Sequence, residues 1–276
     1  MKYMGMPAGM WVLYKKSFTN AMVTELGFSA SQSAEIMRNA KPKYREIIDK
    51  LPEFEKADRF KMNIVNCALF TAVLLNIDKK PSVEALTKFY ATGMMNPPTK
   101  WFCRQSGKKK FADADVQGLK ATAALRAADR NPYSWNMDFL PYEDGSGYEA
   151  RFTKCGICTL MKEYGLYEYV PAMCHLDYTM SDAGGVSEFV REYTLASGGP
   201  YCDCGYKKKA INGVAAYDKE SKKPVIKASI CNGEMVAGFQ NVHTGTFEEV
   251  QLVRNDEEIR DFMQRYGITE KIEKIY

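Results

Sequence analysis

The sequence contains no apolar run long enough to cross a bilayer. The longest, Ala68 to Ile77, spans about ten residues and ends at Asp78-Lys79-Lys80, about half of what a membrane-spanning helix needs. A signal-peptide pattern is also missing, because Pro7 and Gly9 interrupt the mildly apolar N-terminal stretch and no small-residue cleavage site follows. These absences predict a cytoplasmic protein with no membrane partner.

A strong excess of charge of one sign is absent as well. The net charge is only +4 and the basic residues are scattered, so no nucleic-acid partner is expected. Two clusters, Lys108-Lys109-Lys110 and Lys207-Lys208-Lys209, are interpreted as solvated loops or strand ends, because three charges fall short of an interaction tail. We find no repeat, low-complexity linker or nucleotide-binding loop, and no helix pair typical of DNA-binding domains.

The hydrophobic pattern changes near Asn131-Pro132. Before it, apolar residues recur every three or four positions, which predicts helices throughout 1–130. Five are predicted individually: one closed by Gly27, one that runs from a cap at Ser29 to about residue 48, and others over about 64–75, 82–90 and 113–128. After it, period-two alternation predicts a hairpin around residues 142–147 and strands at 188–195 and 201–210, with helices at 155–164 and 167–181 between them. We therefore expect an α+β fold, with an N-terminal helical layer packed on a mostly antiparallel sheet.

The predicted domain organisation has two parts. Residues 1–210 form the main α+β domain, which consists of helical 1–130 and cysteine-rich 131–210. Residues 211–276 are predicted to be a β-rich extension that ends in a helix at 256–266 and packs on the same domain. Exposed strands in this extension would suit a homodimer.

The chain has eight cysteines, which we interpret as thiols because no export signal accompanies them. Cys155-Gly-Ile-Cys158 has the spacing of a metal knuckle or a redox pair. The second pair, Cys202-Asp-Cys204, is separated by one residue, which weakens a four-thiolate zinc site. No cofactor is expected, and a zinc ion remains the alternative.

Five residues are predicted to line a pocket between helix and sheet. Cys174 and Asp177 are three apart in a predicted helix and share a face. Arg191 and Thr194 belong to the next predicted strand, and Cys202 to its neighbour. In the alternative interpretation, the cysteines are ordinary buried side chains and Asp177 pairs with Arg191 as a structural bridge.

Several motifs around these residues resemble one family. They are Cys155-Gly-Ile-Cys158, Tyr164-Gly-Leu-Tyr-Glu168, Pro171-Ala-Met-Cys174-His-Leu-Asp177-Tyr178, Arg191-Glu-Tyr-Thr194 and Cys202-Asp203-Cys204-Gly-Tyr206. Together they resemble the L-2-amino-thiazoline-4-carboxylic acid hydrolase family, and the likeness extends weakly through the N-terminal helices. Cys204 departs from the pattern, because an aromatic residue would be expected there.

The resemblance implies a hydrolase that opens a cyclic amidine-like C–N bond of a small-molecule substrate, such as 2-amino-thiazoline-4-carboxylate, to give N-carbamoyl-L-cysteine. Asp177 would hold the cationic amidine and Arg191 the ring carboxylate, with Thr194 and Asp203 completing the substrate-binding set. Cys174 would be the first choice of nucleophile and Cys202 the second, because a nearby Arg191 should lower the pKa of the thiol and favour the thiolate near neutral pH. A water molecule activated by Asp177 is the other route.

The same layout is also similar to the vinyl-4-reductase-type small-molecule-binding domain, which implies a non-enzymatic sensor or binding module with a structural zinc ion. Thr194 stands where that domain would place a cysteine, and Arg191 lies close to a glutamate position. These two departures make a complete zinc site less expected than a free-standing enzyme or binder.

Overall fold

The computed structural model describes residues 1–127, 129–209, 217–228 and 235–275. It divides into two compact units, Met1–Lys208 and Lys209–Tyr276. The predicted α+β class is confirmed, with helices concentrated towards the N-terminus and two mostly antiparallel sheets after them. The predicted boundary at residue 210 falls outside the described residues. Across the described ranges, no helix is long and apolar enough to span a membrane.

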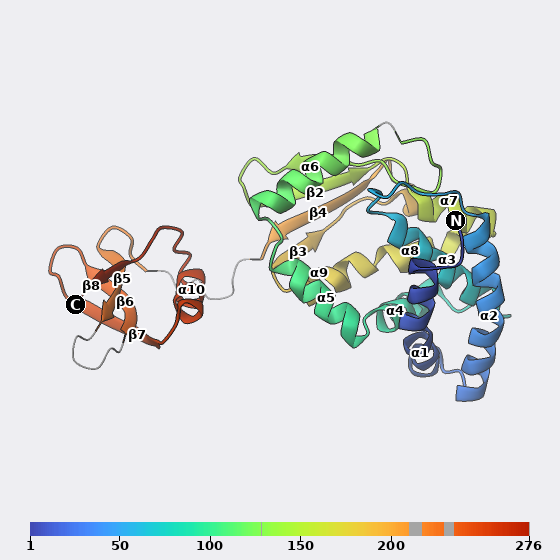
Figure 1. Ribbon diagram of the computed structural model, residues 1–276, viewed down its shortest axis with the longest axis horizontal. Coiled ribbons are helices and arrows are strands. Elements are labelled where there is room, and N and C mark those ends of the chain that lie inside the picture. The colour runs from blue at the N-terminus through green and yellow to red at the C-terminus, as the bar shows by residue number, and fades with distance from the viewer. Residues whose placement is uncertain (128, 210–216, 229–234, 276) are drawn as a thin grey trace. The chain divides into compact units, whose positions relative to one another are not determined.

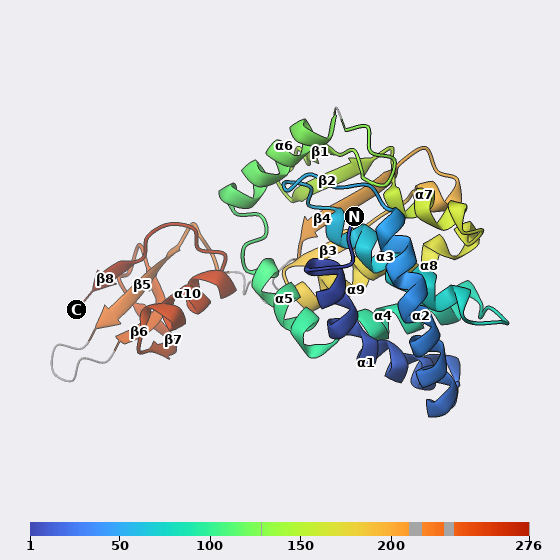
Figure 2. The ribbon, with the colours of Figure 1, turned by 45° about the vertical axis from the view of Figure 1, so that its right-hand side comes forward.

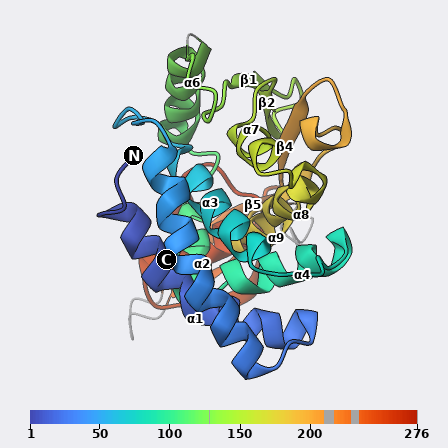
Figure 3. The same cartoon turned by 90° about the vertical axis from the view of Figure 1, so that its right-hand side faces the viewer.

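The first unit begins with a layer of helices, which Figures 1 and 2 show gathered together. Gly27, in the left-handed helical conformation, ends the first helix, and a capping box between Ser29 and Gln32 begins the second. Figure 3 shows these two helices beside the third, which is buried on nearly all sides. The layer comprises α1 (Met6–Leu26), α2 (Ala30–Lys50), α3 (Lys61–Leu75), α4 (Val83–Met94) and α5 (Pro97–Gly107). Helix α6 (Asp113–Ala127) lies apart from them, beside the sheet (Figure 1).

Helix α5 has no counterpart among the helices predicted individually. It begins after Asn96, whose Oδ1 accepts a hydrogen bond from the Thr99 backbone N–H at 3.0 Å, and prolines occupy its first turn. Two of its large apolar side chains, Trp101 and Phe102, are 63% and 51% exposed. Helix prediction from an amphipathic pattern assumes that the apolar side chains face the core. Because these two rings are exposed, the pattern did not predict α5.

The predicted helix at 167–181 is interrupted in the structure. It consists of a 3₁₀ turn at Tyr167–Tyr169, α8 (Val170–Cys174) and α9 (Leu176–Gly184), and α7 (Gly156–Glu163) precedes them. Pro171 occupies the first turn of α8, where its missing N–H costs no hydrogen bond. The join between α8 and α9 falls at His175.

The first sheet has the order β1-β2-β4-β3, and all its neighbours are antiparallel. Its strands are β1 (Asp138–Pro141), β2 (Gly147–Phe152), β3 (Ser187–Val190) and β4 (Cys202–Lys208), and the predicted β1–β2 hairpin is confirmed. Ala150 lies opposite Cys204, and both side chains are buried towards the helices. Arg151 lies opposite Asp203 on the other, more polar face.

The strand predicted over 188–195 ends at Val190. Asp203 of β4 explains this end, because its carboxylate accepts hydrogen bonds from the backbone N–H groups of Glu192 at 2.9 Å and Tyr193 at 2.6 Å. Thr194 then begins a 3₁₀ turn, Leu195–Ser197. Arg191 therefore lies just beyond the strand, in a segment held by a side chain of the sheet.

A buried ion cluster ties α6 to the loops around it. The Arg126 side chain is only 2% exposed and lies 2.9 Å from the carboxylates of both Asp58 and Glu55. It also pairs with Asp129, and the Ser134 hydroxyl donates a hydrogen bond to Asp58 at 2.6 Å. Because a buried guanidinium must be paired, this cluster fixes the segment that leads into the sheet.

The second unit has its own sheet, of order β7-β6-β5-β8, in which β8 pairs with β5 in parallel. Its elements are β5 (Lys222–Ala228), β6 (Met235–Asn241), β7 (Phe247–Val253), α10 (Asp256–Arg265) and β8 (Glu273–Ile275). The buried side chains of this unit include Phe239 and Phe262, which pack on each other around Ile226, Ala237 and Val253. The strands and the helix at 256–266 that the sequence predicts for this region are present within the described residues.

Candidate functional site

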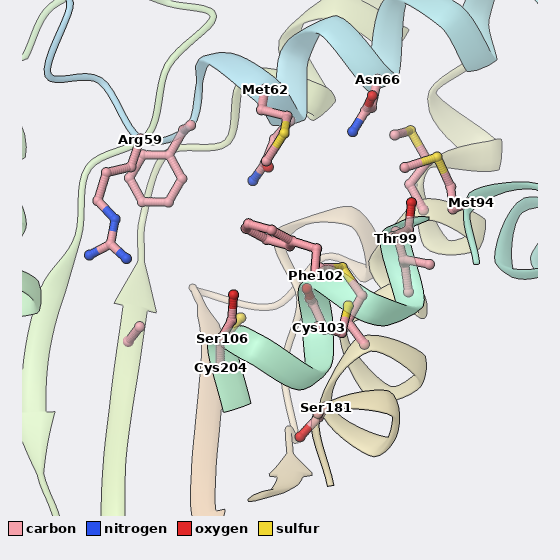
Figure 4. A pocket seen from close by; sticks show the side chains of 18 of the residues that line it. Arg59, Met62, Asn66, Met94, Thr99, Phe102, Cys103, Ser106, Ser181 and Cys204 are labelled. Carbon is pink, nitrogen blue, oxygen red and sulfur yellow. The ribbon is translucent and has the colours of Figure 1, made fainter. Parts of the chain in front are cut away.

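A cavity of about 810 Å³ lies within the first unit, between the helical layer and the inner face of the first sheet. This volume is within the range of small-molecule sites. Figure 4 shows Met62 and Asn66 of α3 pointing towards Phe102 of α5 across the cavity. Its walls are mainly apolar and include seven methionines, namely Met10, Met62, Met94, Met95, Met137, Met173 and Met180.

The predicted Asp177 and Arg191 meet on the wall of this cavity. Arg191 Nη1 donates to Asp177 Oδ2 at 3.1 Å, and Nη2 donates to the carbonyl of Cys174 at 3.1 Å. The aromatic rings of Tyr178 and Phe189 lie 5.3 and 5.2 Å from the guanidinium carbon. The guanidinium is therefore engaged by the protein on several sides, with only 8% of the Arg191 side chain exposed.

The Asp177 carboxylate faces the cavity rather than bulk solvent. Its side chain keeps 41% of its surface accessible, but protein surrounds the space into which it points. Burial therefore raises the pKa of Asp177, while Arg191 and then Lys110 act in the opposite direction. Among the described residues, Arg191 is the group that pairs with this carboxylate, through Oδ2.

Both predicted nucleophiles also lie on the cavity wall. Burial raises the pKa of Cys174, and the lowering effect of Arg191 does not offset it, so the thiolate that we expected there is disfavoured near neutral pH. Burial raises the pKa of Cys202 too, although its sulfur accepts a hydrogen bond from the Leu195 N–H at 3.2 Å. The predicted convergence of these side chains is thus present, but their ionisation differs from the expectation.

The structure does not bring Thr194 and Asp203 to the cavity, and both are absent from its lining. Thr194 Oγ1 accepts a hydrogen bond from the Ser197 N–H at 3.0 Å and so caps a 3₁₀ turn. Asp203 points to the opposite face of β4 and holds the backbone of Glu192 and Tyr193. These two residues shape the segment that carries Arg191, and they do not belong to the cavity wall.

Lys110 is a cavity residue that the sequence interpretation missed. Its ammonium lies 3.4 Å from the centre of the Tyr206 ring and 5.6 Å from that of Tyr148. Burial lowers the pKa of Lys110 to about 8, while Asp115 and Asp177 oppose that shift. The run Lys108-Lys109-Lys110 was predicted to be solvated, and this holds for the first two residues but not for the third. The aromatic residue that follows the run, Phe111, was the available signal.

The Cys155–Cys158 pair lies at the start of α7, and Cys155 lines the cavity. All seven cysteines in the described part of the chain are free thiols, and Cys231 falls outside that part. Within the described ranges, no three Cys, His, Asp or Glu side chains are grouped so that they could hold a metal ion. Cys155 and Cys202 nevertheless lie close enough for charge on one to affect the other.

The comparisons with known proteins bear on this site through one match. The model of the L-2-amino-thiazoline-4-carboxylic acid hydrolase family matches residues 62–206, a span that contains Lys110, Cys155, Asp177 and Arg191. A comparison with curated proteins and another with solved structures each returned no similar protein. Because the matched span covers more than half of the 276 residues, the chain belongs to the L-2-amino-thiazoline-4-carboxylic acid hydrolase family.

Proposed function

We propose that the cavity binds a small cyclic amidine that carries a carboxylate, such as 2-amino-thiazoline-4-carboxylate, and hydrolyses it to N-carbamoyl-L-cysteine. The observation that carries this proposal is the Asp177–Arg191 pair on the wall of a mainly apolar cavity, whose lining also includes the charged residues Lys110, Arg59 and Asp115. A substrate with a cationic amidine and an anionic carboxylate needs one group of each charge. The cavity offers both within a small-molecule-sized volume.

Asp177 suits the amidine end of such a substrate. Arg191 occupies Oδ2, which leaves Oδ1 to accept a hydrogen bond from an amidinium N–H. Charge-assisted hydrogen bonds of this kind are stronger than neutral ones. Arg191 then acts as the partner that orients the carboxylate and keeps it ionised.

Lys110 suits the carboxylate end of the substrate better than Arg191 does, although we first expected Arg191 to bind that carboxylate. Two Arg191 nitrogens already donate to Asp177 and to the carbonyl of Cys174. No carboxylate in the described part of the chain lies within ion-pair distance of the Lys110 ammonium, which instead rests on the Tyr206 ring. An ammonium without a carboxylate partner on a cavity wall is well suited to a substrate anion.

The atom balance identifies the bond that breaks. Water adds to the amidine carbon, its oxygen becomes the carbamoyl carbonyl oxygen, and the ring sulfur leaves as a thiol. Both nitrogens stay on that carbon in N-carbamoyl-cysteine, so the C=N bond becomes single while the ring C–S bond is cleaved. This balance corrects the expected opening of a C–N bond, because the bond that opens the ring is the C–S bond at the amidine carbon.

The proposal is tested by incubating the purified chain with 2-amino-thiazoline-4-carboxylate and measuring released thiol with a colorimetric thiol reagent and released ammonia in parallel. We expect thiol without ammonia, whereas ammonia would indicate C–N cleavage and another product. Asp177→Asn should lower kcat/KM by about 10²–10³, the usual effect of removing one charged group that stabilises a transition state.

Glu188→Gln is the matched control, because Glu188 is an exposed carboxylate on the neighbouring strand β3. This variant should retain the wild-type rate. Full activity in Asp177→Asn would show that the site is assigned wrongly. Binding of the thiazoline without turnover in the wild type would instead favour the ligand-binding alternative.

A further inference from the structure

Cys155 has a position unlike that of the other cavity thiols. It immediately precedes the first residue of α7, an eight-residue helix, and its backbone is extended there. The next residue, Gly156, has no room for a side chain, because an added Cβ would lie 2.0 Å from the carbonyl oxygen of Tyr133. The close approach holds the start of α7 against the segment that contains Trp135. The position of the sulfur is therefore set by two packed segments.

The pKa of Cys155 is lowered from its ordinary value. The Cys158 thiol has the largest effect and lowers the pKa of Cys155, and the amides of Cys158 and Ile157 and the Trp135 indole lower it further against the opposing effect of burial. The amides do so without forming a regular N-cap hydrogen bond. Every other described cysteine has a pKa raised above its ordinary value.

The other titratable groups near Cys155 belong to four different elements. Their charges interact with that of Cys155, and they are Cys67 of α3, Tyr167 of the first 3₁₀ turn, Cys174 of α8 and Cys202 of β4. All of them are neutral in their protonated forms. A thiolate at Cys155 therefore meets no anionic carboxylate among these neighbours, and each of these protonated groups can remain uncharged beside it.

A second, independent feature points to a ligand in the same cavity. Asn66 lines the cavity from α3 and is 8% exposed, yet its Oδ1 has no hydrogen-bond partner. Its neighbour Cys67 is close enough to Cys155 for their charges to interact, and α3 packs against α7. Because a buried unpartnered amide oxygen is costly, a ligand N–H donor would satisfy it. The amidine nitrogens of the proposed substrate are such donors.

We propose that Cys155, rather than Cys174 or Cys202, is the nucleophile that attacks the amidine carbon of the substrate. The inference rests on the proposed function, since it assigns the attacking group for that reaction. Cys158 and Trp135 are positioning residues that hold the attacking sulfur. Asp177 and Asn66 would hold the amidine nitrogens.

The reaction then takes two steps. In the first, the Cys155 sulfur bonds to the amidine carbon, the ring C–S electron pair moves to the ring sulfur, and that sulfur takes a proton. The whole substrate, with its ring open, stays on Cys155 as an S-linked amidinium. In the second, water attacks the same carbon and the bond to Cys155 breaks. The water oxygen becomes the carbonyl oxygen, and its two protons are released as the thiolate returns.

The first test is acid quenching of the full chain during turnover, followed by mass spectrometry of the intact protein and its peptides. We expect an added mass equal to that of the intact substrate on the peptide that contains Cys155. Cys155→Ser should lose this adduct and at least 100-fold in turnover. Serine is favoured at a helix N-cap, so the fold should be preserved. Cys67→Ala, a buried thiol outside the cavity, is the control and should keep both adduct and rate.

The second test does not depend on turnover. Iodoacetamide should alkylate Cys155 before the other six cysteines in the described part of the chain, at a pH below that typical of a free thiol. Cys158→Ala should move this pH profile upwards, and Cys158→Ser should restore it, because a hydroxyl can still donate to the sulfur. A purely structural role for Cys158 would not produce this rescue.

The outcomes separate the two proposals. Wild-type turnover that persists in Cys155→Ser, or an adduct found on Cys174, would overturn Cys155 as the nucleophile and leave the proposed function intact. No turnover of any thiazoline by the wild type would overturn the proposed function. In that case, preferential alkylation of another cysteine would overturn the assignment of Cys155 as the reactive thiol as well.

Discussion

Replacing Lys110 by methionine tests whether this ammonium binds the substrate carboxylate. Methionine keeps an unbranched apolar stem next to Tyr206, whose ring centre lies 3.4 Å from the lysine nitrogen, and it removes only the charge. A hydrogen bond to a charged group contributes about 1.5–3 kcal/mol. Because each 1.4 kcal/mol corresponds to a factor of ten, kcat/KM for the thiazoline carboxylate should fall by about 10- to 150-fold.

The methyl ester of the substrate is the control, since it keeps the amidine ring and lacks the negative charge. Lys110→Met should lower kcat/KM for the acid far more than for the ester, and Lys110→Arg should restore most of the preference for the acid. An equal loss for acid and ester in Lys110→Met would refute the assignment, because it would mean that the lysine supports the cavity without contacting the carboxylate.

The ratio of kcat/KM for the acid to kcat/KM for the ester should also depend on pH. Burial lowers the pKa of Lys110 to about 8, so the free enzyme loses this charge as the pH rises through that value. The preference for acid over ester should therefore decline above pH 8 in the wild type relative to Lys110→Arg, which keeps its charge. Titration of the amidine affects both enzymes alike, because they are compared on the same two substrates. A ratio that is flat between about pH 7 and 9 would contradict the assignment.

Two further predictions concern the framework of the site. Arg126→Met should lower the free energy of unfolding by about 3–5 kcal/mol in urea titrations, because it leaves buried carboxylates unpaired. The control Lys88→Met removes an exposed ion pair within a helix and should change the free energy of unfolding by less than about 0.5 kcal/mol. Similar losses in both variants would contradict the role of the buried cluster. Gly156→Ala should cost about 1–3 kcal/mol and slow the alkylation of Cys155, because the new Cβ would meet the Tyr133 carbonyl oxygen at 2.0 Å. Gly118→Ala in α6, with nothing within 4 Å, is its control and should stabilise the protein by about 0.5–1 kcal/mol; a Gly156→Ala protein as stable as the wild type would show that the packing can adjust.

Much of the fold could be predicted because its signals are local. Gly27 was expected to end the first helix and a cap at Ser29 to begin the second, and both do so in α1 and α2. The end of β3 could not be predicted in this way. Asp203, a residue of another strand, takes the backbone N–H groups of Glu192 and Tyr193 that would otherwise continue the ladder, and only tertiary structure brings it there.

In the candidate site, too, local features could be predicted from the sequence, whereas features that depend on tertiary contacts could not. Cys174 and Asp177 were predicted to share a face of one helix; they belong to two short helices, α8 and α9, yet both line the cavity. The ionisation of a thiol, however, depends on groups that come from distant segments. Trp135 is 20 residues from Cys155 in the chain, and no local pattern indicates that its indole lowers the pKa of that thiol. The role of Lys110 as a cavity residue was not predicted for a related reason, because only the fold places the Tyr206 ring beneath its ammonium.

The separate cores of the two units affect how the stability of this protein must be measured. A chain with two cores need not unfold in a single transition, so one midpoint for the whole chain does not define one free energy. All three tryptophans, Trp11, Trp101 and Trp135, belong to Met1–Lys208. Their fluorescence follows the unit that contains the cavity, while far-ultraviolet circular dichroism sums both units, and the difference between the two curves isolates the unfolding of Lys209–Tyr276.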